Sequence, residues 1–259
     1  MTVVGIDWGT LGHYLELDGA TRRAMGVTAI TAVFAQLFGV ILGTISATMY
    51  LSKGRVLRFL SATYVWFIRG TPLIVQIFFI YYGTNIIFGT NVIPRTISLP
   101  AVTIEGAIVG GVAALAINEG AYMSEIIRAS IQSVPAGQLE AAKAVGLRRF
   151  QAMRHVIWPQ ALRVLIPPLG NEFNNMLKST SLLSFIGINE LFNDAQIRYS
   201  ATFQPVEYFL GVAIIYLALT TVWSLIQAQI EGRLNVAYAP TRPIDSRSWS
   251  TRLFRSSLP

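Results

Sequence analysis

The sequence contains no cysteine, so it can form neither a disulfide bond nor a cysteine-ligated metal site. It is also poor in charge: only 13% of its 259 residues are Asp, Glu, Lys or Arg, whereas 53% are hydrophobic. The mean hydropathy is +0.52. A chain of this composition is too apolar for an ordinary soluble domain, and we expect it to reside in a lipid bilayer.

Several enzyme classes are excluded by what is missing. The two histidines, His13 and His155, lie outside the long apolar segments and form no metal-binding pair. The four aspartates also lie outside those segments, which removes an aspartyl dyad within the membrane: Asp7, Asp18, Asp194 and Asp245. No G-x-S-x-G, H-E-x-x-H or phosphate-binding G-x-x-x-x-G-K-[ST] motif occurs. We therefore predict that the chain is not an enzyme and binds no cofactor or metal of its own.

Five segments are candidates for membrane-spanning helices, each of which needs about 20 apolar residues to cross the hydrocarbon. They extend over Gly26 to Leu51, Pro72 to Phe88, Thr103 to Arg128, Arg163 to Ile186 and Val206 to Ile230. The fourth is the least hydrophobic, and a strict hydropathy window would miss it. We predict an all-α integral membrane protein with about five transmembrane helices.

The distribution of Lys and Arg predicts the orientation of these spans. Four basic residues lie before the first span or after the second and fourth: Arg22, Arg23, Arg95 and Arg198. Thirteen follow the first, third and fifth: Lys53, Arg55, Arg58, Lys143, Arg148, Arg149, Arg154, Arg163, Arg233, Arg242, Arg247, Arg252 and Arg255. Because cytoplasmic loops are rich in Lys and Arg, we expect the N-terminus outside and the C-terminus in the cytoplasm. This pattern explains the net charge of +7 better than nucleic-acid binding does.

The two terminal segments are predicted to lie on opposite sides of the membrane. Residues 1–23 lack the basic start and short apolar run of a cleavable signal, so we expect them to remain as an extracytoplasmic segment. Trp8, Leu11, Tyr14 and Leu15 fall at helical spacing, as in a helix lying at the outer membrane surface. A disordered leader is equally compatible with that spacing. Residues 237–259, rich in Ser, Arg and Pro, predict a poorly ordered cytoplasmic tail.

The loop after the third span, about residues 133–160, carries the most specific pattern. Helix formers predict a short helix over Glu140-Ala141-Ala142, and Gly146 permits the positive φ that ends it. The small alanines leave a thin face that another protein can approach closely, and Glu140 could accept hydrogen bonds from that partner. An ordinary connecting helix is the alternative, because E-A-A alone is common in helices. The register with Val156 and Pro159 favours a docking helix.

Polar residues follow two neighbouring stripes of the fourth span. One stripe is Asn171, Asn174, Lys178 and Ser181, and the other is Glu172, Asn175 and Ser179. A charge at the bilayer centre costs several kcal/mol unless it faces a bundle interior or water. We therefore take as candidate substrate-path residues Asn171, Glu172, Asn175, Lys178 and Ser181, with Glu172 pairing with a cationic group of the substrate. In the alternative interpretation, Glu172 and Lys178 neutralise groups on other helices and touch no substrate. Weaker candidates for gate or packing groups in the third span are Asn118, Glu119 and Glu125.

Further motifs surround these segments. Arg69-Gly70-Thr71-Pro72-Leu73-Ile74-Val75-Gln76 and Tyr81-Tyr82-Gly83 accompany the second span. After the loop come Pro167-Pro168, Gly170-Asn171 and Lys178-Ser179-Thr180-Ser181-Leu182. Together with the docking pattern, and over most of the chain from Ile6 to Glu231, they resemble the permease subunits of the polar amino acid family of bacterial ABC importers. Val156 and Trp158 stand where isoleucine and leucine are usual in that family, and both keep the hydrophobic contact.

The resemblance implies a type I ABC importer permease-like bundle over residues 24–236, with a cytoplasmic coupling helix. It implies that the ATPase docks through Glu140, Ala141, Ala142, Gly146, Arg149 and Pro159. The implied partners are ABC ATPase subunits that bind ATP and Mg²⁺, a second permease subunit, identical or related, an extracytoplasmic amino acid-binding protein, and the lipid of a bacterial cytoplasmic membrane. Nucleic acid is not among them.

The expected cargo is a polar amino acid, and Glu172 favours one that carries a cation. An opine, a sulfur compound or another small polar solute is an alternative cargo. In a different functional class, an ATP-independent channel would use the polar stripe for conduction and the basic loop for regulation.

Overall fold

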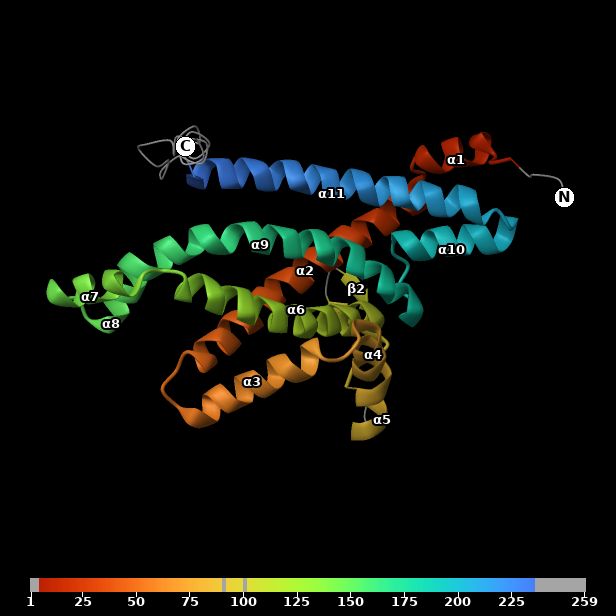
Figure 1. The fold of residues 1–259 in the computed structure, drawn as a ribbon. Coiled ribbons are helices and arrows are strands. Elements are labelled where there is room, and N and C mark those ends of the chain that lie inside the picture. The colour runs from red at the N-terminus through yellow and green to blue at the C-terminus, as the bar shows by residue number, and fades with distance from the viewer. Residues whose placement is uncertain (1–4, 90–91, 100–101, 236–259) are drawn as a thin grey trace, which may run out of the picture.

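The computed structural model describes residues 5–89, 92–99 and 102–235, most of which are helical (Figure 1). The first half contains α1 (Trp8–Leu15), α2 (Gly19–Tyr50), α3 (Arg55–Arg69), α4 (Leu73–Phe78), a π-helical turn η1 (Phe79–Gly83), α5 (Thr84–Phe88) and strands β1 (Thr96–Leu99) and β2 (Val102–Glu105). The second half contains α6 (Gly106–Gln132), α7 (Ala136–Ala144), α8 (Arg149–Ala152), a π-helical turn η2 (Met153–Ile157), α9 (Trp158–Ser179), a 3₁₀ helix η3 (Thr180–Ile186), α10 (Leu191–Thr202) and α11 (Pro205–Asn235). The predicted tail, residues 237–259, lies outside the described residues.

Within the described residues, three helices are long and apolar enough to cross a membrane: α2, α6 and α11. A fourth crossing is possible if α3 and the segment from α4 to α5 are taken as one bent span. The predicted fourth span corresponds to α9 and η3, and α9 lies against both α6 and α11. Its length suffices for a crossing, but it is too polar to qualify by composition, as its sequence predicts. The predicted all-α membrane bundle is confirmed.

The bundle is built on the close crossing of α2 and α6. Gly39 and Gly43 form a small-x-x-x-small motif on α2, which lets two helix backbones approach within the membrane. A Cβ on Gly43 would lie 2.4 Å from the Met123 Cβ and 2.9 Å from the Ser124 backbone nitrogen. A Cβ on Gly39 would lie 2.5 Å from Cγ of Glu119. These two glycines therefore fix the distance between the helices and place Glu119 beside α2.

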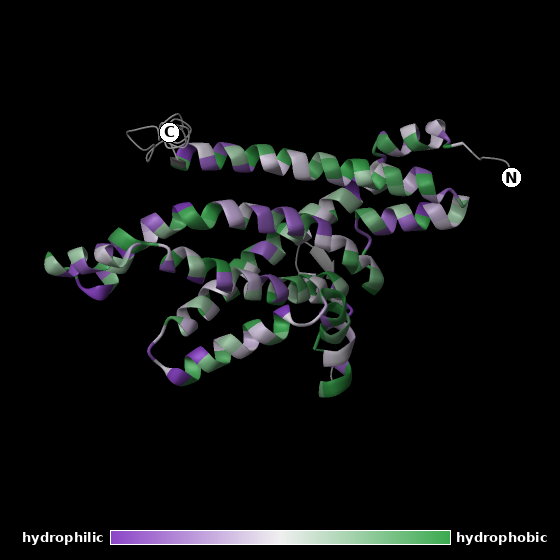
Figure 2. Cartoon of the chain, in the orientation of Figure 1, coloured by the Kyte–Doolittle hydropathy of each residue, from purple (hydrophilic) through white to green (hydrophobic). Residues whose placement is uncertain are grey.

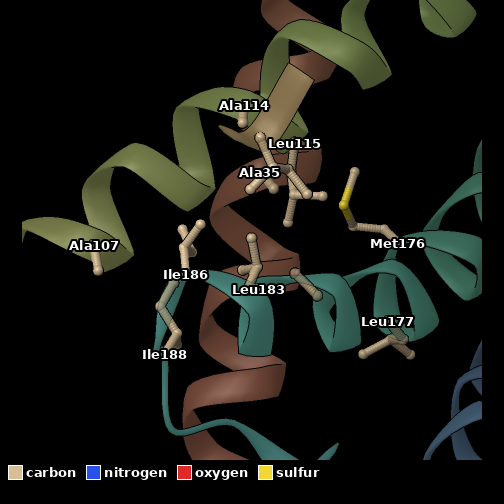
Figure 3. Packing of buried hydrophobic residues seen from close by; sticks show 11 residues of the cluster. Ala35, Ala107, Ala114, Leu115, Met176, Leu177, Leu183, Ile186 and Ile188 are labelled. Carbon is tan, nitrogen blue, oxygen red and sulfur yellow. The ribbon is translucent and has the colours of Figure 1, made fainter. Parts of the chain in front are cut away.

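The main apolar core lies where α2, α6, α9 and η3 meet. Ala35, Ala114 and Leu115 point toward Leu183 and Met176 in this region (Figure 3). Small residues on α2 and α6 face larger ones on α9 and η3, so the layers interdigitate. This core holds the polar middle of α9 against α6.

The segment after the first span differs from the prediction. The sequence from Arg55 to Arg69 forms a helix, α3, that was not predicted, and the predicted span from Pro72 to Phe88 is divided among α4, η1 and α5. The axes of the two parts are bent by 107° at Gly70-Thr71-Pro72. The bend has a clear cause, because Pro72 lacks a backbone N–H and disfavours helix in the residue before it. A β-hairpin then precedes α6, with Thr96 opposite Glu105, so the predicted helix start at Thr103 was wrong by three residues.

The N-terminal segment is a helix that packs on the protein. Leu11 and Tyr14 of α1 are buried, whereas Trp8 is 69% exposed. Tyr14 packs onto the bare backbone of Gly211 in α11, where a Cβ would lie 2.5 Å from the Tyr14 ring. Of the two sequence interpretations, the helix is confirmed over Trp8–Leu15, and the disordered leader is wrong for this described part of the segment. Its position at a membrane surface stays a prediction.

An ionic cluster joins α1, α2 and α10. The Arg198 guanidinium donates to Asp18 at 2.8 Å and to Asp194 at 3.1 Å, and it lies over the Tyr14 ring. The Thr21 backbone N–H and then the Arg198 side chain hold the pKa of the Asp18 carboxyl well below its usual range. Segments about 180 residues apart in the sequence are thereby held together at one end of the bundle.

The two ends of the bundle carry different elements. The helices α7 and α8 lie at one end, with the start of α3 and the end of α11, while α1 and α10 lie at the opposite end (Figure 1). Hydrophilic positions gather at the α7–α8 end and also in the middle of α9, whereas α2 and α11 are mostly hydrophobic (Figure 2). The segments with the basic excess therefore share one end of the molecule.

Candidate functional site

The loop between α6 and α9 folds into a short helix that ends at a glycine. The helix is α7, Ala136–Ala144, and Gly146 has a φ of +82°. The Gly146 N–H donates to the Lys143 carbonyl at 2.9 Å, and the Leu147 N–H donates to the Ala142 carbonyl at 3.0 Å. These two bonds form a Schellman motif, which satisfies the carbonyls of the last turn. The predicted short helix and its positive-φ end are confirmed.

The outer side of this helix is open to a partner. Glu140 and Ala141 are exposed, whereas Ala142 is only 4% exposed and packs against its own chain. The surface continues onto Val145 and Phe150, whose side chains are 76% and 73% exposed. Apolar side chains that project from a loop beside small ones form a patch suited to binding another protein. Of the alanines at 141 and 142, only Ala141 therefore faces outward.

The other two predicted docking residues flank this patch. Arg149 begins α8, Pro159 lies in the first turn of α9, and both residues are exposed. The side chains of Glu140 and Arg149 form no hydrogen bond or ion pair with any other described residue. Both charges therefore remain available to a partner.

A polar cavity of about 390 Å³ lies in the middle of the bundle. Three elements line it: the break between α3 and α4, the middle of α6, and the polar stretch of α9. The lining residues are Thr71, Pro72, Leu73, Leu115, Asn118, Glu119, Tyr122, Glu172, Asn175, Met176 and Ser179. The cavity exists because the chain turns away at Gly70-Thr71-Pro72 and leaves a gap between α6 and α9.

Two carboxylates and no basic residue line this cavity. Glu119 is 4% exposed, and its Oε1 accepts a hydrogen bond from Gln36 Nε2 at 2.9 Å. Neither Glu119 nor Glu172 forms an ion pair with a basic residue in the part of the chain that the structure describes. A buried carboxylate without a cationic neighbour, such as Glu119, is costly, and a cation that enters the cavity would relieve that cost. The arrangement therefore suits a ligand with an ammonium or guanidinium group.

Gln76 holds the wall of the cavity in place. Its Nε2 donates to the Ile68 carbonyl at 2.7 Å and to Thr71 Oγ1 at 2.8 Å, across the chain break. Its Oε1 accepts from Asn118 Nδ2 at 3.0 Å. One buried amide thus fixes the end of α3, the turn and the face of α6. The shape of the cavity depends on this residue.

A second ionic cluster borders the cavity at Tyr122. Glu125 accepts hydrogen bonds from Arg128 Nη2 at 2.8 Å and from Arg128 Nε at 3.2 Å. Arg69 lies 3.8 Å from the same carboxylate, and its guanidinium stands 5.1 Å from the centroid of the Tyr122 ring. Arg69 thus links the end of α3 to α6.

The candidate substrate-path residues do not share one surface. Glu172 and Asn175 line the polar cavity. Lys178 and Ser181 instead line a cavity of about 610 Å³ formed with α10 and α11, and Asn171 lines neither of these two cavities. The division has a simple reason: the two polar stripes of α9 point in different directions, one toward α6 and one toward α11.

Sequence reasoning gave too little weight to the residues that complete the cavity. Asn118 and Glu119 appeared only as weaker candidates, and Thr71 only as part of a motif. A carboxylate in the middle of a long apolar segment is itself a signal of function, and Glu119 is such a carboxylate. Nothing in the sequence, however, indicates that the Thr71 turn lies opposite Glu119.

Residues 39–236 match the family described as binding-protein-dependent transport system inner membrane component. The chain belongs to this family. It is therefore a membrane-spanning component of a transport system without an enzymatic activity of its own, and the resemblance found in the sequence is confirmed.

Similar members of this transport family share about two fifths of their residues with the chain. The probable amino-acid ABC transporter permease protein PatM of Vibrio harveyi is 39% identical over 87% of this chain and 96% of its own length. The probable amino-acid permease protein YxeN of Bacillus subtilis is 39% identical over 83% and 92%, respectively. A solved structure, described as an amino acid ABC transporter with histidines, is 36% identical and covers 88% of this chain and 99% of its own, with a TM-score of 0.75.

Proposed function

We propose that this chain is the permease subunit of an ATP-driven importer of polar amino acids, and that its cargo carries a positive charge. The observation that carries the proposal is the pair of carboxylates, Glu119 and Glu172, in one central cavity with no basic lining residue. The similar proteins named as amino-acid permeases support the cargo class. A volume of about 390 Å³ is compatible with a single amino acid.

Within the cavity each group has a distinct role. The Glu172 and Glu119 carboxylates attract the cationic group of the substrate, while the amides of Asn175 and Asn118 and the Ser179 hydroxyl offer hydrogen bonds to its polar atoms. Because these groups are held on helices and not on loops, the site keeps its shape while empty. When the substrate binds, contact with its cationic group replaces the hydration that the carboxylates lose in the cavity.

The ATPase docks on the exposed side of α7. Glu140, Ala141 and Arg149 contact the partner directly, Gly146 and Pro159 shape the loop on either side, and Ala142 acts from within by packing α7 on its own chain. ATP and Mg²⁺ bind to the ATPase and not to this chain. Movement of the docked ATPases is transmitted through α7 to α9, which begins shortly after the loop, and it rocks the bundles between inward-open and outward-open states.

The assembly lies in the cytoplasmic membrane of a bacterium with the α7–α8 end in the cytoplasm. Two permease subunits, identical or related, form the path, because each chain has one docking helix for one ATPase. An extracytoplasmic amino acid-binding protein delivers the cargo at the end that carries α1 and α10. The basic residues gathered at the α7–α8 end support this orientation.

Binding of amino acids directly to the purified permease–ATPase complex tests the proposal, because the selectivity of the binding protein does not contribute to the result. We expect radiolabelled arginine to bind more tightly than glutamine, and Glu172→Gln or Glu119→Gln to weaken arginine binding about tenfold or more, as loss of a charged hydrogen bond would. Glu16→Gln, which removes an exposed carboxylate at the end of α1, is the matched control and should bind normally. Equal binding of arginine in all variants would contradict the proposed site. Solute flux through liposomes without ATP would favour a channel.

A further inference from the structure

A small groove of about 230 Å³ lies between α2 and α3 and shares no lining residue with the polar cavity. Its apolar lining residues are Leu42, Ile45, Met49, Leu60 and Ile117. Ile45 and Leu60 are 53% and 50% exposed, so the groove opens to the outside of the bundle. Every exposed residue of α2 between Ile30 and Ile45 is large and apolar, which suits contact with lipid tails.

The hydroxyl groups in this groove are already hydrogen-bonded within the protein. Ser61 Oγ donates to the Ser46 carbonyl at 2.8 Å, and the Tyr64 hydroxyl donates to the Ile117 carbonyl at 2.6 Å. A polar solute would therefore gain little here, whereas a hydrocarbon chain needs no hydrogen bonds. The groove is also smaller than the roughly 300–1,000 Å³ of ordinary small-molecule sites. It is suited to part of one acyl chain.

Three basic residues lie where α2 ends and α3 begins: Lys53, Arg55 and Arg58, the basic turn. All three are exposed, at the end of the bundle that also carries α7 and α8 (Figure 1). The side chains of Lys53 and Arg55 form no hydrogen bond or ion pair with the other described residues, and Arg58 Nη2 donates to the Ser52 carbonyl at 3.1 Å. Neither α2 nor α3 contains an acidic residue that could neutralise them. The basic turn therefore attracts an anion from outside the chain.

The groove begins beside the basic turn and follows one leaflet inward. Met49 is next to the last residue of α2, and Leu42 lies seven residues deeper, or about 11 Å at 1.5 Å per residue. On α3, Leu60 and Tyr64 lie about 8 and 14 Å beyond Arg55. Half of the hydrocarbon core of a bilayer is about 15 Å thick. An acyl chain in the groove would thus place its phosphate at the basic turn.

We propose that the groove and the basic turn together bind one anionic phospholipid. One acyl chain lies in the groove, and the phosphate pairs with the basic turn. A zwitterionic lipid offers the same chain but adds a cation of its own, which the unpaired basic residues disfavour. The site requires only that the chain spans a bilayer, so it does not depend on the cargo. Because α3 ends at the turn that lines the polar cavity, a lipid bound at its start also stabilises one wall of that cavity.

Lipid binding by the purified full-length chain tests the role of charge. The chain is incubated in mild detergent with phosphatidylglycerol or phosphatidylcholine of the same acyl chains, and bound lipid is measured by native mass spectrometry. We expect at least tenfold tighter binding of phosphatidylglycerol. Arg55→Gln/Arg58→Gln should lose this preference, since each basic residue near a membrane surface contributes about fivefold. The matched control is Arg22→Gln/Arg23→Gln, which removes two exposed charges from the other end of α2 and should keep the preference. An unchanged preference in Arg55→Gln/Arg58→Gln, or an equal loss in the control, overturns the proposal.

A larger side chain in the groove tests the position of the acyl chain. Because the two arginines also help to orient the chain in the membrane, this variant leaves them in place. Leu60→Trp should fill part of the groove and weaken the binding of both lipids several-fold. Phe59→Trp is its control, because Phe59 is 68% exposed and does not line the groove. Undiminished binding by Leu60→Trp overturns the proposal, as does recovery of a second protein that occupies the groove in place of lipid.

Discussion

Replacement of Gly146 by aspartate should impair docking of the ATPase without impairing the folding of this chain. A Cβ at this position would meet no atom within 4 Å, so an added side chain clashes with nothing in the chain itself. The remaining cost is conformational, because φ is +82°. A residue with a Cβ pays about 1–2 kcal/mol in this region, and Asn and Asp adopt it more readily than other residues. We therefore expect Gly146→Asp to reach the membrane in normal amount with a melting temperature close to that of the natural protein.

Binding of the ATPase, in contrast, should be strongly weakened by Gly146→Asp. The new carboxylate would project beside the apolar side chain of Val145, and a closely docked ATPase would have to bury it without a partner. A penalty of about 2 kcal/mol or more corresponds to at least a 30-fold loss of ATPase binding. Co-purification of the ATPase and amino acid uptake should both be abolished. The matched control is Gly146→Asn, which has the same shape without the charge and should retain more of both. Undiminished uptake by Gly146→Asp at a normal membrane level would refute the docking assignment.

Two further predictions concern stability. Gly43→Ala should lower the melting temperature in detergent, because its methyl group would overlap Met123 and push α2 away from α6 at a cost of about 1–3 kcal/mol. Gly26→Ala on the same helix meets no neighbour and should leave the stability unchanged or slightly raised. Equal effects of the two substitutions would contradict the proposed crossing of α2 and α6. The depressed pKa of the Asp18 carboxyl stabilises the fold at neutral pH, and this contribution is lost as the pH falls below about 4. Asp18→Asn should therefore melt at a lower temperature than the natural protein at pH 7, with a difference that shrinks on acidification; a difference that does not vary with pH would argue against the Asp18–Arg198 pair.

The long helices and the docking helix could be predicted because their signals are local. A run of apolar residues is enough to define α2 or α11, and a glycine after a short alanine-rich helix is enough to define its end at Gly146. The helix α3 gives no such signal, since Arg55 and Arg58 at its start and Arg69 at its end make it too polar for a hydropathy window. The sharp bend at Pro72 was visible in the sequence as a helix boundary, but its angle depends on packing and on the hydrogen bonds of Gln76.

The cavity was predictable only in part, for a different physical reason. Helical periodicity places Glu172 and Lys178 on different stripes of α9, but it cannot say which neighbouring helix each stripe faces. That choice follows from the crossing of α2 and α6, where Gly39 and Gly43 admit Glu119 and set the position of the α6 face. The information is present in the sequence, but it lies in residues far from those that it positions.

The same geometry bears on the two interpretations of the ionisable groups on α9. Glu172 and Lys178 are six residues apart, which separates them by about 9 Å along the helix and about 120° around it. They cannot pair with each other, and within the described residues neither pairs with a charge on another helix. Among the described residues of a single chain, neither side chain therefore has an ion-pair partner. Glu172 lines the polar cavity, where we propose that a substrate cation meets it, whereas Lys178 lines the cavity formed with α10 and α11. The two ionisable groups of α9 therefore belong to two different cavities, and of these two only the cavity of Glu172 is lined by a second carboxylate, Glu119.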